Sequence, residues 1–157
     1  MAKYKRIFLD GYSYYITIVT HRRNPILVEN IELLRESFRV SKSKYPYVIN
    51  AIVVLPDHIH MIITPHIATD YPKIIRAIKY HFSTHCDEKF YAHIEQSTSR
   101  HKRGSKPIWQ KRFYEHTLRN DKEYQKCLSY IYHNPIKHGY VTQINDWKYS
   151  SYHTSQP

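Results

Sequence analysis

Two histidines separated by one apolar residue stand near the middle of the chain, as His58-Ile59-His60. The stretch 58–64 (HIHMIIT) has the composition of a β-strand, in which residues i and i+2 point to the same face. Both imidazoles then project together, while Ile59 and Met61 point into the core on the opposite side. Such a pair forms a two-point metal site that needs one or two more ligands. The alternative interpretation is two histidines without a ligand on a polar sheet face.

A second group with chemical potential lies near the end of a predicted helix. Tyr130 and Asn134 are four residues apart, so their side chains meet on one helix face, whereas Tyr132 points roughly 160° away from Asn134. If the Tyr130 face lies against the two histidines, a phenol, two imidazoles and an amide oxygen converge. They could bind a hard divalent cation and place a nucleophile beside it. The alternatives are an ordinary tyrosine at the core boundary and an asparagine that caps the helix.

The hydrophobic pattern predicts the elements that would position these residues. Strands are expected at 12–20, 47–55, 58–64 and 109–118, and helices at 30–44, 70–86 and from Asn120 or Asp121 to about His133, where Pro135 forces the end. The segment 87–107 has no periodicity and is predicted to be a mobile basic loop. This order favours an α+β fold in one domain over 1–157, namely a ferredoxin-like antiparallel sheet with helices packed on one face.

The composition limits the class of partner. The 157 residues include 24 Lys and Arg against 13 Asp and Glu, a formal net charge of +11, which favours nucleic acid and, second, an anionic membrane surface. No apolar run approaches the roughly 18 residues needed to span a membrane, and no glycine-rich phosphate-binding motif predicts a nucleotide cofactor. Cys86 and Cys127 form no CxxC motif, and residues 1–12 have no signal-peptide apolar region, so we expect a reducing cytoplasm.

Several motifs, taken in order, resemble the REP-associated tyrosine transposases, a branch of the single-tyrosine HUH transposases and nucleases. HUH denotes the pair His58 and His60, here within VVLPDHIHMI. The other matching segments are Tyr4-Lys5-Arg6, 109–116 (WQKRFYEH), 130–139 (YIYHNPIKHG), Asp146-Trp147, Ser150-Ser151 and His153. The ordered set spans nearly the whole chain and is far more specific than the histidine pair alone. Two features depart from the family: Tyr132 stands where many relatives carry histidine, and the 87–107 loop is longer than in compact members.

The resemblance implies a set of roles for these residues. Tyr130 matches the catalytic nucleophile, His58 and His60 the metal-binding pair, and Asn134 the third polar ligand, for Mg²⁺ or Mn²⁺. The implied protein is a DNA transposase and single-strand endonuclease that cleaves and rejoins single-stranded DNA next to palindromic hairpins through a 5′-phosphotyrosine intermediate. It also implies a bacterial origin, a nucleoid-associated cytoplasmic location, and either a monomer or a homodimer.

The basic residues fit a DNA partner, because Lys and Arg contacts to phosphates supply most of the affinity. The candidate DNA-binding residues are Arg6, Lys79, Lys106, Lys111, Arg112 and Lys137, together with the loop 100–106. Lys137 is also our hypothesis for the proton acceptor, since tyrosine has a reference pKa of about 10 and needs help to react at neutral pH.

Two other functions stay open at this stage. One is a catalytically silent protein of ferredoxin-like fold that binds hairpin DNA or RNA, although the aromatic motif of RNA-recognition domains is missing. The other is a metal-dependent hydrolase that uses a bound water, in which Tyr130 would be dispensable. Substitution of Tyr130 by phenylalanine separates the tyrosine mechanism from the water mechanism.

Overall fold

The computed structural model describes residues 5–155, so Tyr4 of the family-like opening and the last two residues lie outside the described part. Its sheet has four antiparallel strands in the order β2-β3-β1-β4. The strands are β1 (Ser13–Val19), β2 (Tyr47–Val54), β3 (His58–Pro65) and β4 (Tyr114–Leu118). This order, with a helix in each long connection, is that of the ferredoxin-like fold. The predicted α+β class is therefore confirmed.

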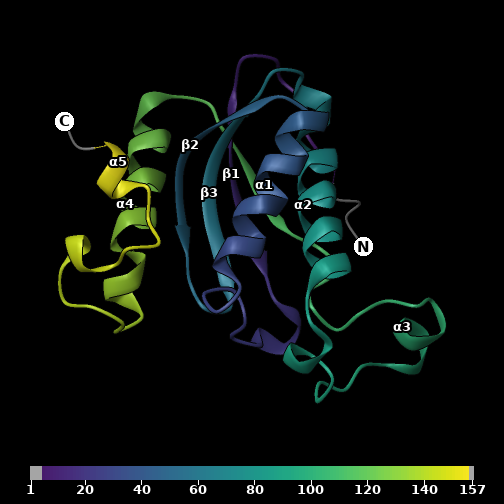
Figure 1. Ribbon diagram of the computed structural model, residues 1–157. Helices are drawn as coiled ribbons and strands as arrows, with labels where there is room; N and C mark the ends of the chain where they lie inside the picture. Colours follow the sequence, from purple (N-terminus) through teal and green to yellow (C-terminus); the bar gives the residue numbers. More distant parts are fainter. Residues whose placement is uncertain (1–4, 156–157) are drawn as a thin grey trace.

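The long helices cover both faces of the sheet. Helices α1 (Ile31–Lys44) and α2 (Tyr71–His85) pack on one face, as predicted, and α4 (Asp121–Lys137) packs on the other (Figure 1). The short helices are α3 (Thr98–Lys102) and α5 (Tyr152–Ser155), with 3-10 turns at His21–Arg23, Ala68–Asp70, Glu88–Phe90 and Ile144–Asp146. No helix within residues 5–155 has the length and apolar character needed to cross a bilayer.

Strand β3 is covered on both sides, which explains its almost continuous apolar sequence. Ile59 and Met61 belong to the larger core beneath α1 and α2, and Ile62 belongs to a second core with Ile131 of α4. Because side chains alternate along a strand, His60 shares the α4 face with Ile62. The two histidines therefore point toward the helix that carries Tyr130.

Helix α4 extends to Lys137, so the predicted end at His133 is wrong. Pro135 lacks an N–H and removes one helical hydrogen bond, but the last turn is closed around it. The backbone N–H of His138 donates to the carbonyl of Asn134 (3.1 Å), and that of Tyr140 donates to the carbonyl of Pro135 (3.0 Å). The bias against helical angles before a proline is overcome here, which keeps Asn134 inside the helix.

The segment 87–107 contains one 3-10 turn and α3, so part of the predicted irregular loop has regular structure. The side chain of Arg100 ties it together by donating to the carbonyls of Lys106 (3.2 Å) and Trp109 (3.3 Å). Its mobility stays a prediction.

The last strand is shorter than the predicted strand 109–118. It pairs with β1 only from Tyr114 onward, and Trp109, in the irregular stretch before it, forms an isolated bridge.

The chain after α4 follows the outer edge of β2. Ser150 forms an isolated antiparallel bridge with Val53, and the N–H of Ser151 donates to the carbonyl of Ile52 at 2.9 Å. The indole N–H of Trp147 donates to the carbonyl of Val54 at 3.0 Å. This contact covers an edge that would otherwise offer unpaired backbone groups.

Candidate active site

His58 is held in one tautomer by the residue that precedes it. Its ring lies 4.8 Å from that of His60, measured between centroids, and both side chains are buried. Nδ1 of His58 lies 2.6 Å from Oδ1 of Asp57, whose other oxygen lies 3.5 Å from Nη1 of Arg23. A carboxylate accepts and does not donate, so Nδ1 carries a proton, and in the neutral ring Nε2 has a free lone pair. Carboxylate support of this kind is usual for a histidine that binds metal.

His60 is supported from the neighbouring strand. Its Nδ1 lies 2.8 Å from both the Tyr15 hydroxyl and the Thr17 hydroxyl, and Thr17 stands directly opposite it in the β1–β3 register. Burial, reinforced by His58 and His138, lowers the pKa of His60 to about 3, so the ring is neutral and able to act as a ligand. Burial also raises the pKa of Tyr15 to about 12. Tyr15 is therefore suited to positioning His60 and not to nucleophilic attack.

Tyr130 presents its phenol between the histidines and solvent. Its ring centroid lies 5.3 Å from that of His60, and the side chain is 39% exposed. Nζ of Lys137 lies 3.3 Å from the phenol oxygen and 4.9 Å from the ring centroid. A cavity of about 600 Å³, lined in part by Tyr15, His116 and Tyr130, opens beside the phenol. The sequence-based pairing of Tyr130 with the histidine face is thus what the structure shows.

Asn134 lies between the two contacts that α4 makes with the histidines. Tyr130, one turn before it, contacts His60, and His138, one turn after it, has its ring 5.1 Å from that of His58. Asn134 itself is fully buried, and neither Oδ1 nor Nδ2 has a hydrogen-bond partner among the described residues. An unsatisfied buried amide costs about 1–3 kcal/mol. Because α4 continues to Lys137, Asn134 is not the helix cap, and its side-chain oxygen is an unused acceptor on the helix segment that contacts the two imidazoles.

This donor set fits a divalent cation with mixed nitrogen and oxygen ligands. Residues 5–155 contain no group of three or more His, Cys, Asp or Glu side chains that could hold a metal. The ligands available are then the two imidazoles, the Asn134 amide oxygen and water. Few protein ligands with several waters suit Mg²⁺ and its relatives, which give up water reluctantly.

Four residues of the site were missed from the sequence, namely Asp57, Tyr15, Thr17 and His138. Asp57 has the clearest signal, since it directly precedes the histidine pair, but it reads equally well as a turn residue. The alternation of β1 places Tyr15 and Thr17 on one face, yet only the strand register shows which histidine they meet. His138 lies two turns after Tyr130 on the same helix face, beyond the end that Pro135 predicts.

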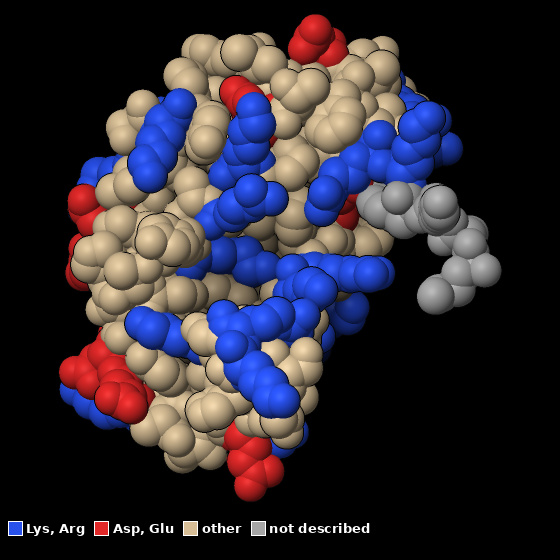
Figure 2. Space-filling model, turned by 90° about the vertical axis from the view of Figure 1, so that its right-hand side faces the viewer, with Lys and Arg blue, Asp and Glu red and all other residues tan. Residues whose placement is uncertain are grey.

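The predicted DNA-binding residues lie in two separate parts of the structure. Lys137 lies at Tyr130, whereas the other five line a groove of about 600 Å³ beside α2. Its lining includes no acidic side chain and eight basic ones: Arg6, Arg76, Lys79, Arg100, Arg103, Lys106, Lys111 and Arg112. Figure 2 shows Lys and Arg side chains gathered around a hollow on this face. We call this surface the basic groove.

Aromatic and backbone groups hold the side chains of the basic groove. The guanidinium of Arg6 lies 5.1 Å from the centre of the Phe113 ring, and Nζ of Lys79 donates to the carbonyl of Gln110 at 2.7 Å. Burial, with the charge of Arg100, lowers the pKa of Lys79 to about 8. The ammonium of Lys106 donates to the carbonyl of Ser83 at 2.9 Å.

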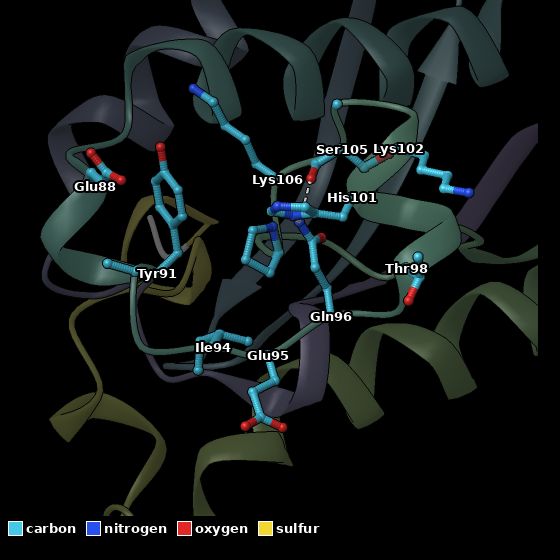
Figure 3. Close-up of a pocket in the computed structure, with 13 residues that line it drawn as sticks. Glu88, Tyr91, Ile94, Glu95, Gln96, Thr98, His101, Lys102, Ser105 and Lys106 are labelled. Atoms are coloured by element: carbon cyan, nitrogen blue, oxygen red, sulfur yellow. Dashed lines mark hydrogen bonds between the residues drawn. The ribbon is translucent and has the colours of Figure 1, made fainter.

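A larger cavity of about 880 Å³ lies within the segment 87–107 and shares Ser105 and Lys106 with the basic groove. Tyr91 stands at one side of it, opposite Gln96 and His101 (Figure 3). Its lining contains Glu88 and Glu95 and none of the residues around Tyr130. It therefore lies apart from the histidine–tyrosine site and is less suited to phosphate than the groove.

The family model, the related sequence and the solved structure that match this chain are all of transposases. The family model "Transposase IS200 like" matches residues 9–134. A REP-associated tyrosine transposase of Escherichia coli K12 is 37% identical over 155 residues, which is 98% of this chain and 84% of that protein. A solved structure of a REP-associated tyrosine transposase bound to a REP hairpin superposes with a TM-score of 0.78 at 36% identity, covering 98% of this chain and 84% of the other.

Proposed function

The chain belongs to the REP-associated tyrosine transposases of the IS200-like family, and from this premise we propose that it cleaves and rejoins single-stranded DNA next to a palindromic hairpin with Tyr130 as nucleophile. The observation that carries the proposal is the placement of the Tyr130 phenol, which is open to solvent, 5.3 Å from His60 between ring centroids, and one turn from the buried Asn134. We propose that His58, His60 and Asn134 hold Mg²⁺ or Mn²⁺, which would polarise and orient the scissile phosphate.

The chemistry balances without another reactant. The Tyr130 oxygen attacks the phosphorus, the bond from phosphorus to the 3′ oxygen breaks, and the products are a 5′-phosphotyrosine and a free 3′-hydroxyl. The phenol proton is released, and the departing 3′ oxygen takes up a proton. Attack by another 3′-hydroxyl on the phosphotyrosine restores the phenol and joins the DNA. The ammonium of Lys137 contacts the phenol oxygen, so its direct role is to stabilise the phenolate by charge; acceptance of the proton would require a neutral amine.

We propose that the basic groove receives the phosphate backbone of the hairpin. The groove and Tyr130 lie on opposite sides of the sheet, with α2 on one side and α4 on the other (Figure 1). Residues 111–114 connect them, because Lys111 and Arg112 line the groove and the Tyr114 ring lies 6.0 Å from Tyr15. Tyr114 is exposed on an edge strand, where it can stack an unpaired base. A strand that leaves the hairpin can follow this edge to Tyr130.

A catalytically silent hairpin-binding protein is the second candidate, and the exposed basic groove by itself would suit it. The active-site residues favour the enzyme, since pure DNA binding does not call for a buried unsatisfied Asn134 on the helix that contacts two oriented imidazoles. A cytoplasmic, nucleoid-associated location and a monomeric or dimeric state remain part of the proposal.

A trapping assay tests the proposal. Labelled hairpin oligonucleotides with single-stranded flanks are mixed with the protein and Mn²⁺ or EDTA, and a denaturant-resistant protein–DNA adduct is sought. Tyr132→Phe is the matched control, because Tyr132 is on the same helix but its ring packs on Tyr152 at 5.2 Å. We expect a metal-dependent adduct that is lost only in Tyr130→Phe. Cleavage that survives Tyr130→Phe would indicate a water mechanism, and tight binding without any adduct would favour the silent protein.

A further inference from the structure

Helix α2 carries a pair of histidines that the proposed DNA chemistry does not use. His81 and His85 stand on successive turns, and their rings are stacked with centroids 4.2 Å apart and planes 26° apart. His81 contacts α1 through Ser37, on the sheet face opposite α4. The pair is therefore separate from His58 and His60.

The hydrogen bonds of Ser37 fix the tautomer of His81. The Ser37 hydroxyl lies 2.8 Å from the carbonyl of Leu33, which can only accept, so its single proton points there. The same oxygen lies 2.9 Å from Nδ1 of His81 and must accept from it. His81 therefore carries its proton on Nδ1. In the neutral ring, Nε2 then has a free lone pair.

A backbone carbonyl fixes the tautomer of His85 in the same way. Nδ1 of His85 lies 2.9 Å from the carbonyl oxygen of His81, so this nitrogen must donate. Both rings thus use Nδ1–H on an oxygen of the protein and leave Nε2 for another partner. This arrangement of support is the one that metal-binding histidines usually have.

The pair can be reached from solvent. His85 is exposed and His81 half-buried, so an ion can reach the pair from solvent without movement of the core.

We propose that His81 and His85 form a binding site for a first-row transition-metal ion such as Ni²⁺, Cu²⁺ or Zn²⁺, with water completing its coordination. Histidines four residues apart on one helix face can ligate a single ion. Because each lone pair lies in the plane of its ring, the exposed His85 ring has to turn from its stacked position for both Nε2 atoms to meet that ion. Imidazole nitrogens suit these metals, and a pair of imidazoles without a protein oxygen such as that of Asn134 favours them over Mg²⁺ and Mn²⁺. The site differs in this way from the one proposed at Asn134, and a bound ion would join two turns of α2 next to α1.

Titration of the full-length protein with Ni²⁺ by isothermal calorimetry tests the site. His85→Asn removes one ligand at an exposed position, and we expect the number of bound Ni²⁺ ions to fall by one. His133→Asn is the matched control, because His133 is also exposed on a helix and donates through Nδ1 to a carbonyl, that of Ser129 (2.8 Å), but has no histidine four residues away. The control should bind as many ions as the wild type. Any Ni²⁺ bound at His58 and His60 contributes equally to all three proteins.

A second variant tests the hydrogen-bond argument. Ser37→Ala keeps both histidines but removes the acceptor of His81, and the loss of such support typically weakens metal binding about 10- to 100-fold. We expect the same number of sites with a correspondingly higher dissociation constant at this one. Equal stoichiometry and affinity in the wild type and His85→Asn would overturn the proposal. Unchanged affinity in Ser37→Ala would overturn the role of the fixed tautomer.

Discussion

At the level of single residues, the phenol of Tyr130 and the ammonium of Lys137 form the contact on which reactivity depends most directly. The nitrogen lies 3.3 Å from the phenol oxygen, where its positive charge can stabilise negative charge that develops on this oxygen when the phenol loses its proton. The contact thus connects the side-chain geometry with the rate of attack on DNA.

We expect Lys137→Met to slow formation of the protein–DNA adduct about tenfold at pH 7, less than the hundredfold or more lost with a fully buried oxyanion donor. Lys137→Arg keeps the charge and should retain most of the activity. Single-turnover rates between pH 6 and 9 measure this, and a Lys137→Met protein that matches the wild type throughout would exclude the role.

Lys79 makes the stability of the protein depend on pH. Its pKa is about 8 in the folded protein, against an ordinary value of 10.5, so between these values the unfolded chain binds the proton and the folded chain does not. Stability contributed by this group therefore rises with pH across the window. We expect the difference in unfolding free energy between wild type and Lys79→Met to increase from pH 8 to pH 10. Urea unfolding at several pH values measures it, and a constant difference would contradict the assignment.

At the level of elements, helix α4 determines whether the site is assembled at all. It brings Tyr130 to His60 and, just after its end, His138 to His58, with Asn134 on the turn between them. Its last turn depends on Gly139, whose φ of +76° lies in the left-handed region and whose N–H donates to the carbonyl of Ile136 at 2.9 Å. A glycine at this point allows the chain to leave the helix without steric cost.

Gly139→Ala should destabilise the protein by about 1 kcal/mol, because an L-residue with a side chain pays roughly 1–2 kcal/mol in this conformation. Gly139→Asn should cost less, since asparagine tolerates left-handed angles. The midpoint of urea unfolding at constant m-value measures both changes. If alanine and asparagine were equally tolerated, the last turn of α4 would have to end in another way.

The elements were largely predictable from the sequence, and their mutual placement was less so. The strand containing His58 and the helix containing Tyr130 follow from local hydrophobic pattern, and the i, i+4 spacing joined Tyr130 with Asn134. The face that α4 covers could not be read from β3, which is apolar on both sides. The continuation through Pro135 depends on the bonds made by residues 138–140, and the support of His60 by Thr17 depends on long-range strand register.

At the level of the whole molecule, the charged side chains behind the net charge of +11 are unevenly distributed over the surface. The basic groove gathers eight cations without an acid, whereas on α1 Arg35 and Arg39 are paired with Glu32 and Glu36. Charge that is already paired on the surface has little effect on a polyanion beyond a Debye length of about 8 Å. The groove, and not the total charge, should therefore set the affinity for DNA.

This argument predicts the salt dependence of hairpin binding. Each phosphate contact contributes about 0.9 to the slope of log K against log salt for duplex DNA, so Lys111→Gln and Arg112→Gln should each reduce the slope by nearly one unit. Arg35→Gln is the matched control, because it removes the same charge from a surface outside the groove and should leave the slope unchanged. Fluorescence anisotropy with a labelled hairpin at several salt concentrations measures the slopes. Equal reductions in all three variants would mean that the hairpin responds to total charge and does not occupy the groove.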